Sequence, residues 1–167
     1  MDLLFAAIYE LKKQNYFETH ALKFLIAGEF YESSQPYFDL IKEYDIAEQL
    51  ILKTEFIADS EIKYYLSCAD CVIQPYKQAT QSGVTPLAYH FEKPMIVTNV
   101  GGLPALVPET VGLVCEPNAT AIANAITNFY KQDLQQFENN IKEEKKKYGW
   151  DKITQAILSL ARIQNSL

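Results

Sequence analysis

The feature that most constrains the fold is a regular alternation of apolar runs and polar turns across residues 71–117. Short apolar runs of strand length alternate there with stretches of helical pattern, and the runs read CVIQP, MIVTN and GLVCEP. Such runs, bounded by turn residues, are typical of strands buried on both faces. Strands that alternate with helices form parallel sheets covered on both sides. The segment therefore predicts an α/β chain, with any ligand at the carboxyl ends of the strands.

The same alternation extends over the rest of the chain. Apolar patterns predict strands at 23–28 and 50–56 and helices at 2–18, around 37–41 and at 59–66, the last with Asp59 as its N-cap. Further helical patterns follow the last strand at 119–131, 133–147 and 150–164. No linker rich in proline, glycine or serine divides the 167 residues, so we expect a single domain over 1–167.

A polar turn lies between the strand run CVIQP and the helical pattern VTPLAYHF. It contains Thr80, Gln81, Ser82 and Gly83, which offer hydroxyls, an amide and an unobstructed backbone. The first N–H groups of a helix have no partner within the helix and favour an anion. The turn is therefore a candidate site for the diphosphate of a nucleotide. The alternative is a turn in which Ser82 or Thr80 merely caps the helix.

Charge and cysteine content exclude several classes of protein. The net charge is −6 with a single arginine, Arg162, which argues against nucleic acid as a partner. The run of three lysines at 145–147 is local. It indicates a helix face exposed to solvent, and the alternative is weak binding to a membrane surface.

The three cysteines lie in or beside apolar segments, so we expect small core residues in a reducing compartment rather than a metal or redox site. No secretion signal and no long apolar stretch is present in the sequence. We therefore expect a cytoplasmic location.

Four stretches carry a family resemblance. They read LKFLIAGE, LILKTEFIADSEIKYYLSCADCVIQPY, EKPMIVTNVGGLPALV and VGLVCEPNATAIANAI. The last two resemble the patterns GKPVVATxVGGxPE and GxLVxPxDxxxLAxAI of the glycosyltransferase group 1 family, and the first two are similar to further blocks of that family. The resemblance runs over almost the whole chain. It opposes the alternative of a flavodoxin-like or other doubly wound nucleotide-binding module.

The resemblance implies a GT-B fold, of which this chain is similar to the C-terminal half. That half is a Rossmann-like three-layer α/β/α domain that binds the nucleotide diphosphate-sugar donor, here a UDP- or GDP-sugar. The N-terminal acceptor domain, and a first strand with a basic loop that reaches the diphosphate, fall outside this sequence. The family transfers the sugar to an acceptor with retention of anomeric configuration, with no obligatory metal and no cofactor. The resemblance implies an unidentified acceptor in glycan or lipid-linked glycan synthesis. Membrane association is common for enzymes that build cell-surface glycans, so peripheral association of the full-length enzyme at the inner face of a membrane is the corresponding expectation.

Four strand ends meet the predicted crevice, at residues 27–29, 56–58, 76–83 and 99–102. The resemblance points to donor-binding residues at the first three of them. The glycine turn at Gly28 is expected near the diphosphate, and Phe56, Ile57 and Ala58 are expected to face the base. Tyr76, at the end of a strand, has a ring that can stack on a base or sugar. Lys77 can supply positive charge toward the diphosphate. The alternatives are a simple tight turn at Gly28 and an exposed loop lysine at position 77.

The chain departs from the family at two glutamates, one that contacts the sugar and one that contacts the ribose hydroxyls. Alignment from Lys93 and Pro94 places Ala79 and Leu87 at these positions. Neither side chain can accept hydrogen bonds from vicinal hydroxyls. Either Thr80, Gln81, Ser82 or Thr85 supplies polar contacts instead, or the domain is a degenerate, non-catalytic binding or scaffold domain. The catalytic residues are not identified by the sequence.

Overall fold

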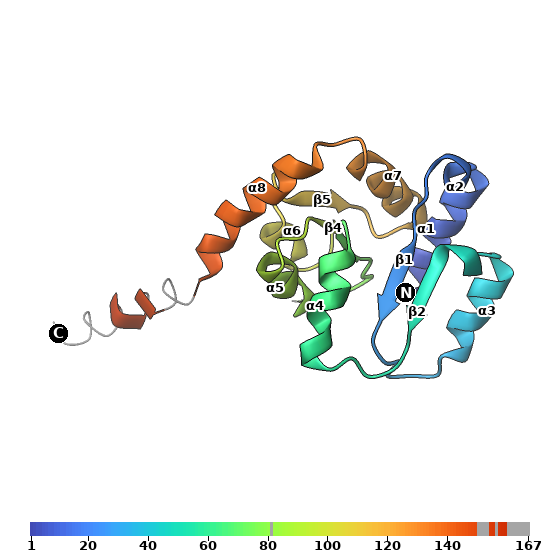
Figure 1. Ribbon diagram of the computed structural model, residues 1–167, viewed down its shortest axis with the longest axis horizontal. Coiled ribbons are helices and arrows are strands. Elements are labelled where there is room, and N and C mark those ends of the chain that lie inside the picture. Colours follow the sequence, from blue (N-terminus) through green and yellow to red (C-terminus); the bar gives the residue numbers. More distant parts are fainter. Residues whose placement is uncertain (81, 150–153, 156, 160–167) are drawn as a thin grey trace.

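The structure is a computed structural model that describes residues 1–80, 82–149, 154–155 and 157–159. Helices and strands alternate through most of the chain (Figure 1). The strands are β1 (Phe24–Ala27), β2 (Leu50–Lys53), β3 (Val72–Gln74), β4 (Met95–Thr98) and β5 (Gly112–Cys115). The α-helices are α1 (Asp2–Lys13), α2 (Tyr16–Thr19), α3 (Gln35–Glu43), α4 (Asp59–Cys68), α5 (Val84–His90), α6 (Leu103–Leu106), α7 (Ala119–Phe129) and α8 (Leu134–Glu144). Two 3-10 turns, Ala47–Gln49 and Lys145–Tyr148, also lie within the described residues.

Within the part of the chain that the structure describes, the strand pairs are parallel, as predicted, but they form two ladders instead of one. One sheet has the order β1-β2 and the other the order β3-β4-β5. The register pairs Phe24 with Leu50 in the first sheet and Met95 with Gly112 in the second. In Figure 1 the β1–β2 pair lies beside α3, whereas β4 and β5 lie near α6 and α8. The α/β class predicted from the sequence is confirmed.

Two apolar clusters show that helices cover both faces of the three-stranded sheet. On β4, Ile96 points into a cluster built mainly by α1 and α7, while Met95 and Val97 point into a second cluster formed with α5 and α6. Every residue of β4 is buried. The helix α8 contributes Phe137 to the first cluster and Ile141 to the second. This arrangement explains the continuous apolar pattern of the strand run MIVTN.

The ends of several elements differ from the sequence-based expectation. The helix predicted over 2–18 is divided into α1 and α2 because Asn15 adopts a left-handed backbone with φ 56°. The strand predicted over 50–56 ends at Lys53, opposite Ala27, where Gly28 ends the pairing. Asp59 is the first residue of α4 and not its N-cap, since the extended residue Ala58 holds that position. The carboxylate of Asp59, in the first turn of α4, is still stabilised by the positive end of the helix dipole.

The C-terminal helices begin at side-chain caps. The side chain of Asn118 accepts a hydrogen bond from the backbone N–H of Ala121 at 2.9 Å, and Asp133 caps α8 through the N–H groups of Gln135 and Gln136. Such caps satisfy N–H groups that have no partner inside the helix. In the helix predicted over 150–164, residues 154–155 and 157–159 are helical, and the rest of that prediction lies outside the described residues.

The three cysteines are free thiols. Cys71 and Cys115 are half-buried, in line with the expected core role, but Cys68 is exposed on α4, so the prediction of a core cysteine is wrong at that position. The α4 segment carries no fully buried residue, and its outer face reaches solvent at Cys68.

Burial should make the stability of the protein depend on alkaline pH through Cys71. Burial raises the pKa of this thiol from 9.0 to about 12. The unfolded chain therefore loses this proton at a lower pH than the folded chain. We expect the free energy of unfolding to fall between pH 9 and about 12, by up to about 1.4 kcal/mol per pH unit.

Urea denaturation at a series of pH values would measure this slope. Cys71→Val should have a shallower slope than the wild type, whereas the exposed-site variant Cys68→Val should keep the wild-type slope. Parallel slopes for the wild type and Cys71→Val would contradict the assignment.

Candidate nucleotide-binding site

Buried polar residues anchor the loop that follows β3. The hydroxyl of Thr98, on β4, donates to the carbonyl oxygen of Tyr76 at 2.7 Å and to that of Gln74 at 3.3 Å. The hydroxyl of Thr85, in the first turn of α5, donates to the side-chain oxygen of Gln74 at 3.1 Å. Gln74, Thr85 and Thr98 are each at most 2% exposed. These bonds fix both ends of the loop relative to the sheet.

The side-chain nitrogen of Gln74 is buried and has no hydrogen-bond partner among the described residues. A buried donor without a partner costs about 1–3 kcal/mol. Neither Gln74 nor Thr98 was predicted from the sequence to belong to the site. The available signal was a polar residue at the last position of each apolar strand, β3 and β4.

The loop also packs tightly on the glycine turn between β4 and α6. A Cβ atom at Gly101 would lie 1.6 Å from the carbonyl oxygen of Ala79, and Gly101 has a φ of +53°. The backbone N–H of Gly102 donates to the carbonyl oxygen of Thr80 at 3.3 Å. Only a residue without a side chain permits this approach. The two loops, at the ends of neighbouring strands, therefore form one packed unit.

Ser82 organises the start of α5. Its hydroxyl oxygen accepts a hydrogen bond from the backbone N–H of Val84 at 3.2 Å and lies 3.3 Å from the hydroxyl of Tyr76. The N-cap position of α5 is held by Gly83 and has no side-chain cap bond. Ser82 thus forms a local turn just before the helix and, with Tyr76, brings two of the predicted site residues together. Thr80 is exposed beside them, and Gln81 lies outside the described residues.

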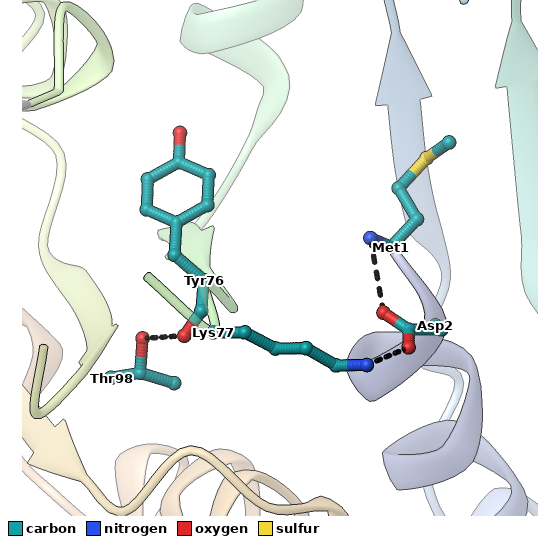
Figure 2. Close-up of polar contacts among 5 residues, drawn as sticks. All are labelled: Met1, Asp2, Tyr76, Lys77 and Thr98. Carbon is teal, nitrogen blue, oxygen red and sulfur yellow. Dashed lines mark hydrogen bonds and ion pairs between the residues drawn. The ribbon is translucent and has the colours of Figure 1, made fainter. Parts of the chain in front are cut away.

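Lys77 reaches away from this loop to the start of α1. Figure 2 shows its ammonium group in an ion pair with Asp2, which also lies 3.8 Å from the terminal amine of Met1. Burial is the largest single influence on Asp2 and acts against its charged form, but the hydrogen bonds from Lys77 and the Leu3 backbone, together with the charges of Lys77 and the terminal amine, hold the pKa of this carboxyl below its ordinary value. The positive charge predicted for a diphosphate is therefore already paired with a carboxylate.

The remaining predicted residues follow β1 and β2. Gly28 has a φ of +125° and open space where a Cβ atom would lie, and its N–H donates to the carbonyl oxygen of Lys53 at 2.9 Å. Glycine is thus required by the backbone, and the space beside it is accessible. Phe56 is 71% exposed, while Ile57 and Ala58 are half-buried. The ring of Phe56 is a free apolar surface at the carboxyl edge of the sheet.

The two positions that lack the family glutamates carry alkyl side chains. Ala79 is half-buried against the second apolar cluster, and Leu87 is 36% exposed on α5. A carboxylate lies elsewhere on the same edge of the sheet, where Glu116 accepts a hydrogen bond from the side chain of Asn99 at 3.1 Å. Within the described residues, no group of three His, Cys, Asp or Glu side chains is placed to hold a metal ion.

A groove of about 550 Å³ opens between β1 and β3. Its lining includes Ala27 at the carboxyl end of β1 and Pro75, Tyr76 and Val84 beyond β3. The candidate loop therefore adjoins the groove. No helix within the described ranges has the length and apolar character needed to cross a membrane.

The fold is similar to part of several solved GT-B glycosyltransferases. The chain is similar to sucrose-phosphate synthase from Thermosynechococcus elongatus (TM-score 0.71, 20% identity, 98% of this chain and 43% of that one). It is also similar to Anabaena Alr3699/HepE solved with UDP-glucose (TM-score 0.74, 21% identity, 100% and 45%) and to TarM (0.77, 19%, 95% and 32%). The chain thus spans less than half the length of these proteins.

A family model named glycosyl transferases group 1 matches residues 1–132. The chain belongs to this family, and its partial coverage of the structures above is consistent with the C-terminal half of a GT-B protein. No match was found among curated proteins.

Proposed function

We propose that this chain is the donor-binding part of a glycosyltransferase that moves a sugar from a nucleotide diphosphate-sugar to an acceptor. The observation that carries the proposal is the family match together with the anchored polar loop at the carboxyl edge of the sheet. Alr3699/HepE, of the same fold, has been solved in complex with UDP and with UDP-glucose. We propose a UDP- or GDP-sugar as the donor here.

In this proposal each part of the site has a separate task. Backbone N–H groups at residues 81–83 and the open turn at Gly28 hold the diphosphate. Phe56 stacks on the base, and Tyr76, bonded to Ser82, shapes the loop. Transfer proceeds with retention and without a metal or other cofactor. The acceptor binds to the glycosyltransferase half that lies outside this chain, so we expect this chain alone to bind nucleotide weakly and to transfer no sugar.

The second candidate is a degenerate domain that serves as a binding or scaffold partner. The alkyl side chains of Ala79 and Leu87 favour it, because they cannot hold sugar or ribose hydroxyls. The anchoring of the loop through Gln74, Thr85 and Thr98 favours the donor site, because a loop without a ligand has no need of a buried polar support.

Titration with UDP and then GDP, followed by backbone amide NMR, distinguishes these two functions. Chemical-shift changes at Gly28, at residues 56–58 and at residues 76–83 would support the donor site. The preferred base would then reduce the number of candidate donor sugars. No shift of these amides at millimolar nucleotide, in this chain and in a longer form that includes the second half, would favour the scaffold.

Phe56→Ala should weaken nucleotide binding without changing stability. Loss of one stacking contact is worth about 1 kcal/mol, or about fivefold in the dissociation constant, whereas an exposed side chain contributes little to folding. Calorimetric titration with the preferred nucleotide measures the effect. Tyr64→Ala, which removes a 65% exposed ring from α4, is the matched control and should keep the wild-type affinity. Equal affinities for both variants would refute the stacking role.

We also propose a cytoplasmic location, with peripheral association at the inner face of a membrane in the full-length enzyme. Cell fractionation followed by a high-salt wash tests this: release from the membrane fraction by salt supports peripheral binding, and retention after the wash contradicts it.

A further inference from the structure

A second groove, of about 540 Å³, lies between β5 and α8, and its lining lies outside the candidate nucleotide site. Figure 1 shows these two elements next to each other. The apolar part of the lining consists of Leu113 and Val114 from β5 and Phe137 from α8. The side chain of Asn140 donates to the carbonyl oxygen of Thr110 at 2.9 Å, which fixes α8 to the segment that enters β5. The groove is therefore bounded by a strand on one side and a helix on the other.

The outer edge of β5 carries backbone groups without partners. Among the described strands, β5 pairs only with β4. The carbonyl oxygens of Val111 and Cys115 accept hydrogen bonds from β4 and from the residue that follows it. Alternate residues of a strand direct their backbone groups to opposite edges, so the N–H and C=O groups of Gly112 and Val114 face away from β4. No hydrogen bond joins these groups to another part of the described chain, so the edge is free to pair with a further strand.

Strand β5 contains no charged residue and no proline, the residues that commonly keep a free edge from pairing. By comparison, β2, which pairs only with β1 among the described strands, ends in Lys53. The side chain of Val114 is also 37% exposed. An incoming strand would pair the free backbone groups and cover this apolar side chain at the same time.

The polar part of the lining is acidic. Glu109 and Asp133 contribute carboxylates, and no lysine or arginine is among the described residues that line the groove. Glu109 is exposed and makes no ion pair or hydrogen bond within the described residues, whereas Asp133 caps α8. Gln132 and Gln136 add amide groups that can donate and accept. Because the whole chain has a net charge of −6, these carboxylates oppose a second copy of the chain and favour a basic partner.

We propose that the groove between β5 and α8 binds an extended segment of a partner polypeptide that carries lysine or arginine. The backbone of the segment pairs with the free edge of β5, which is the mode of peptide recognition by strand addition. Its alternate side chains pack on Val114 and place a basic group at Glu109. This surface is separate from the candidate nucleotide site, so the proposal does not depend on nucleotide binding.

Titration of the full chain with a short designed peptide tests the proposal. The peptide alternates valine with lysine over about six residues, the ordinary length of a strand. Backbone amide NMR without nucleotide should show saturable chemical-shift changes at Gly112 and Val114 at millimolar peptide, and none at Gly28. A peptide with glutamate in place of lysine should bind at least about fivefold more weakly. The lysine peptide with every backbone nitrogen methylated should not bind, because it has no N–H groups for pairing.

Glu109→Gln measures the contribution of charge. It should weaken binding of the lysine peptide about twofold to fivefold at low salt, and added salt should reduce this difference. The matched control is Glu61→Gln, which removes the same charge from an exposed position on α4 and should keep the wild-type affinity.

The proposal is overturned if the lysine peptide causes no change at Gly112 and Val114 while slow amide exchange at Val97 of β4 shows that the protein is folded. Equal binding of the methylated peptide would rule out strand addition. Changes at the same amides that grow with protein concentration alone would assign the groove to a second copy. Tighter binding of maltose than of the lysine peptide would assign it to a saccharide. Failure of nucleotide binding would leave these readouts unchanged.

Discussion

Gly101→Ala is expected to destabilise the protein by about 2–4 kcal/mol and to weaken nucleotide binding. The added methyl group would meet the carbonyl oxygen of Ala79, and alanine disfavours the left-handed backbone of this turn. The least costly relaxation moves residues 79–80 away from the turn. That movement breaks the bond between Gly102 and Thr80 and displaces the candidate phosphate loop. Urea denaturation and titration with UDP measure the two effects.

Gly83→Ala is the stability control for this prediction. Gly83 has an ordinary φ of −64° and open space where a Cβ atom would lie, so the added methyl group meets nothing. Its free energy of unfolding should remain within about 0.5 kcal/mol of the wild type. If Gly101→Ala were equally stable, the close packing of the two loops would be wrong.

Phe129→Ala should cause the largest loss of stability, about 3–5 kcal/mol. Phe129, the last residue of α7, is fully buried and stacks on Phe137 of α8 with ring centroids 5.6 Å apart. It lies in the cluster that joins α1, α7 and the sheet, so its removal leaves a cavity between three elements. For a domain of this size, we expect the melting temperature to fall by about 10 °C or more.

Thermal and urea denaturation measure this effect, with Phe56→Ala as the control for loss of an aromatic ring. Phe56 is 71% exposed, so its variant should unfold within about 0.5 kcal/mol of the wild type. Equal losses in the two variants would show that the cluster around Phe129 tolerates a cavity.

The order of strands and helices was predictable because apolar runs such as MIVTN must be buried on both faces. The buried residues of β4 and the two clusters on either side of it confirm this reasoning. Boundaries were less predictable. Asn15 ends α1 through a left-handed backbone, which asparagine tolerates but does not require, and β2 ends where its partner β1 ends.

The polar support of the candidate site was not predictable, because it depends on contacts between segments far apart in the sequence. Gln74 meets Thr85 and Thr98 only after β3, β4 and α5 have packed together. The approach of Gly101 to Ala79 likewise requires both loops in place. The family resemblance predicted which strand ends form the site, whereas the division of the described strands into two ladders was not predicted from the sequence.

The ion pair between Lys77 and Asp2 changes how the site responds to salt. An anion that approaches Lys77 must take the place of an attached carboxylate, so binding is an exchange of partners rather than the neutralisation of a free charge. Added salt weakens the internal pair and the incoming pair together. The affinity for a diphosphate should therefore vary little with ionic strength in the wild type, and Asp2→Asn should make it both tighter and more sensitive to salt.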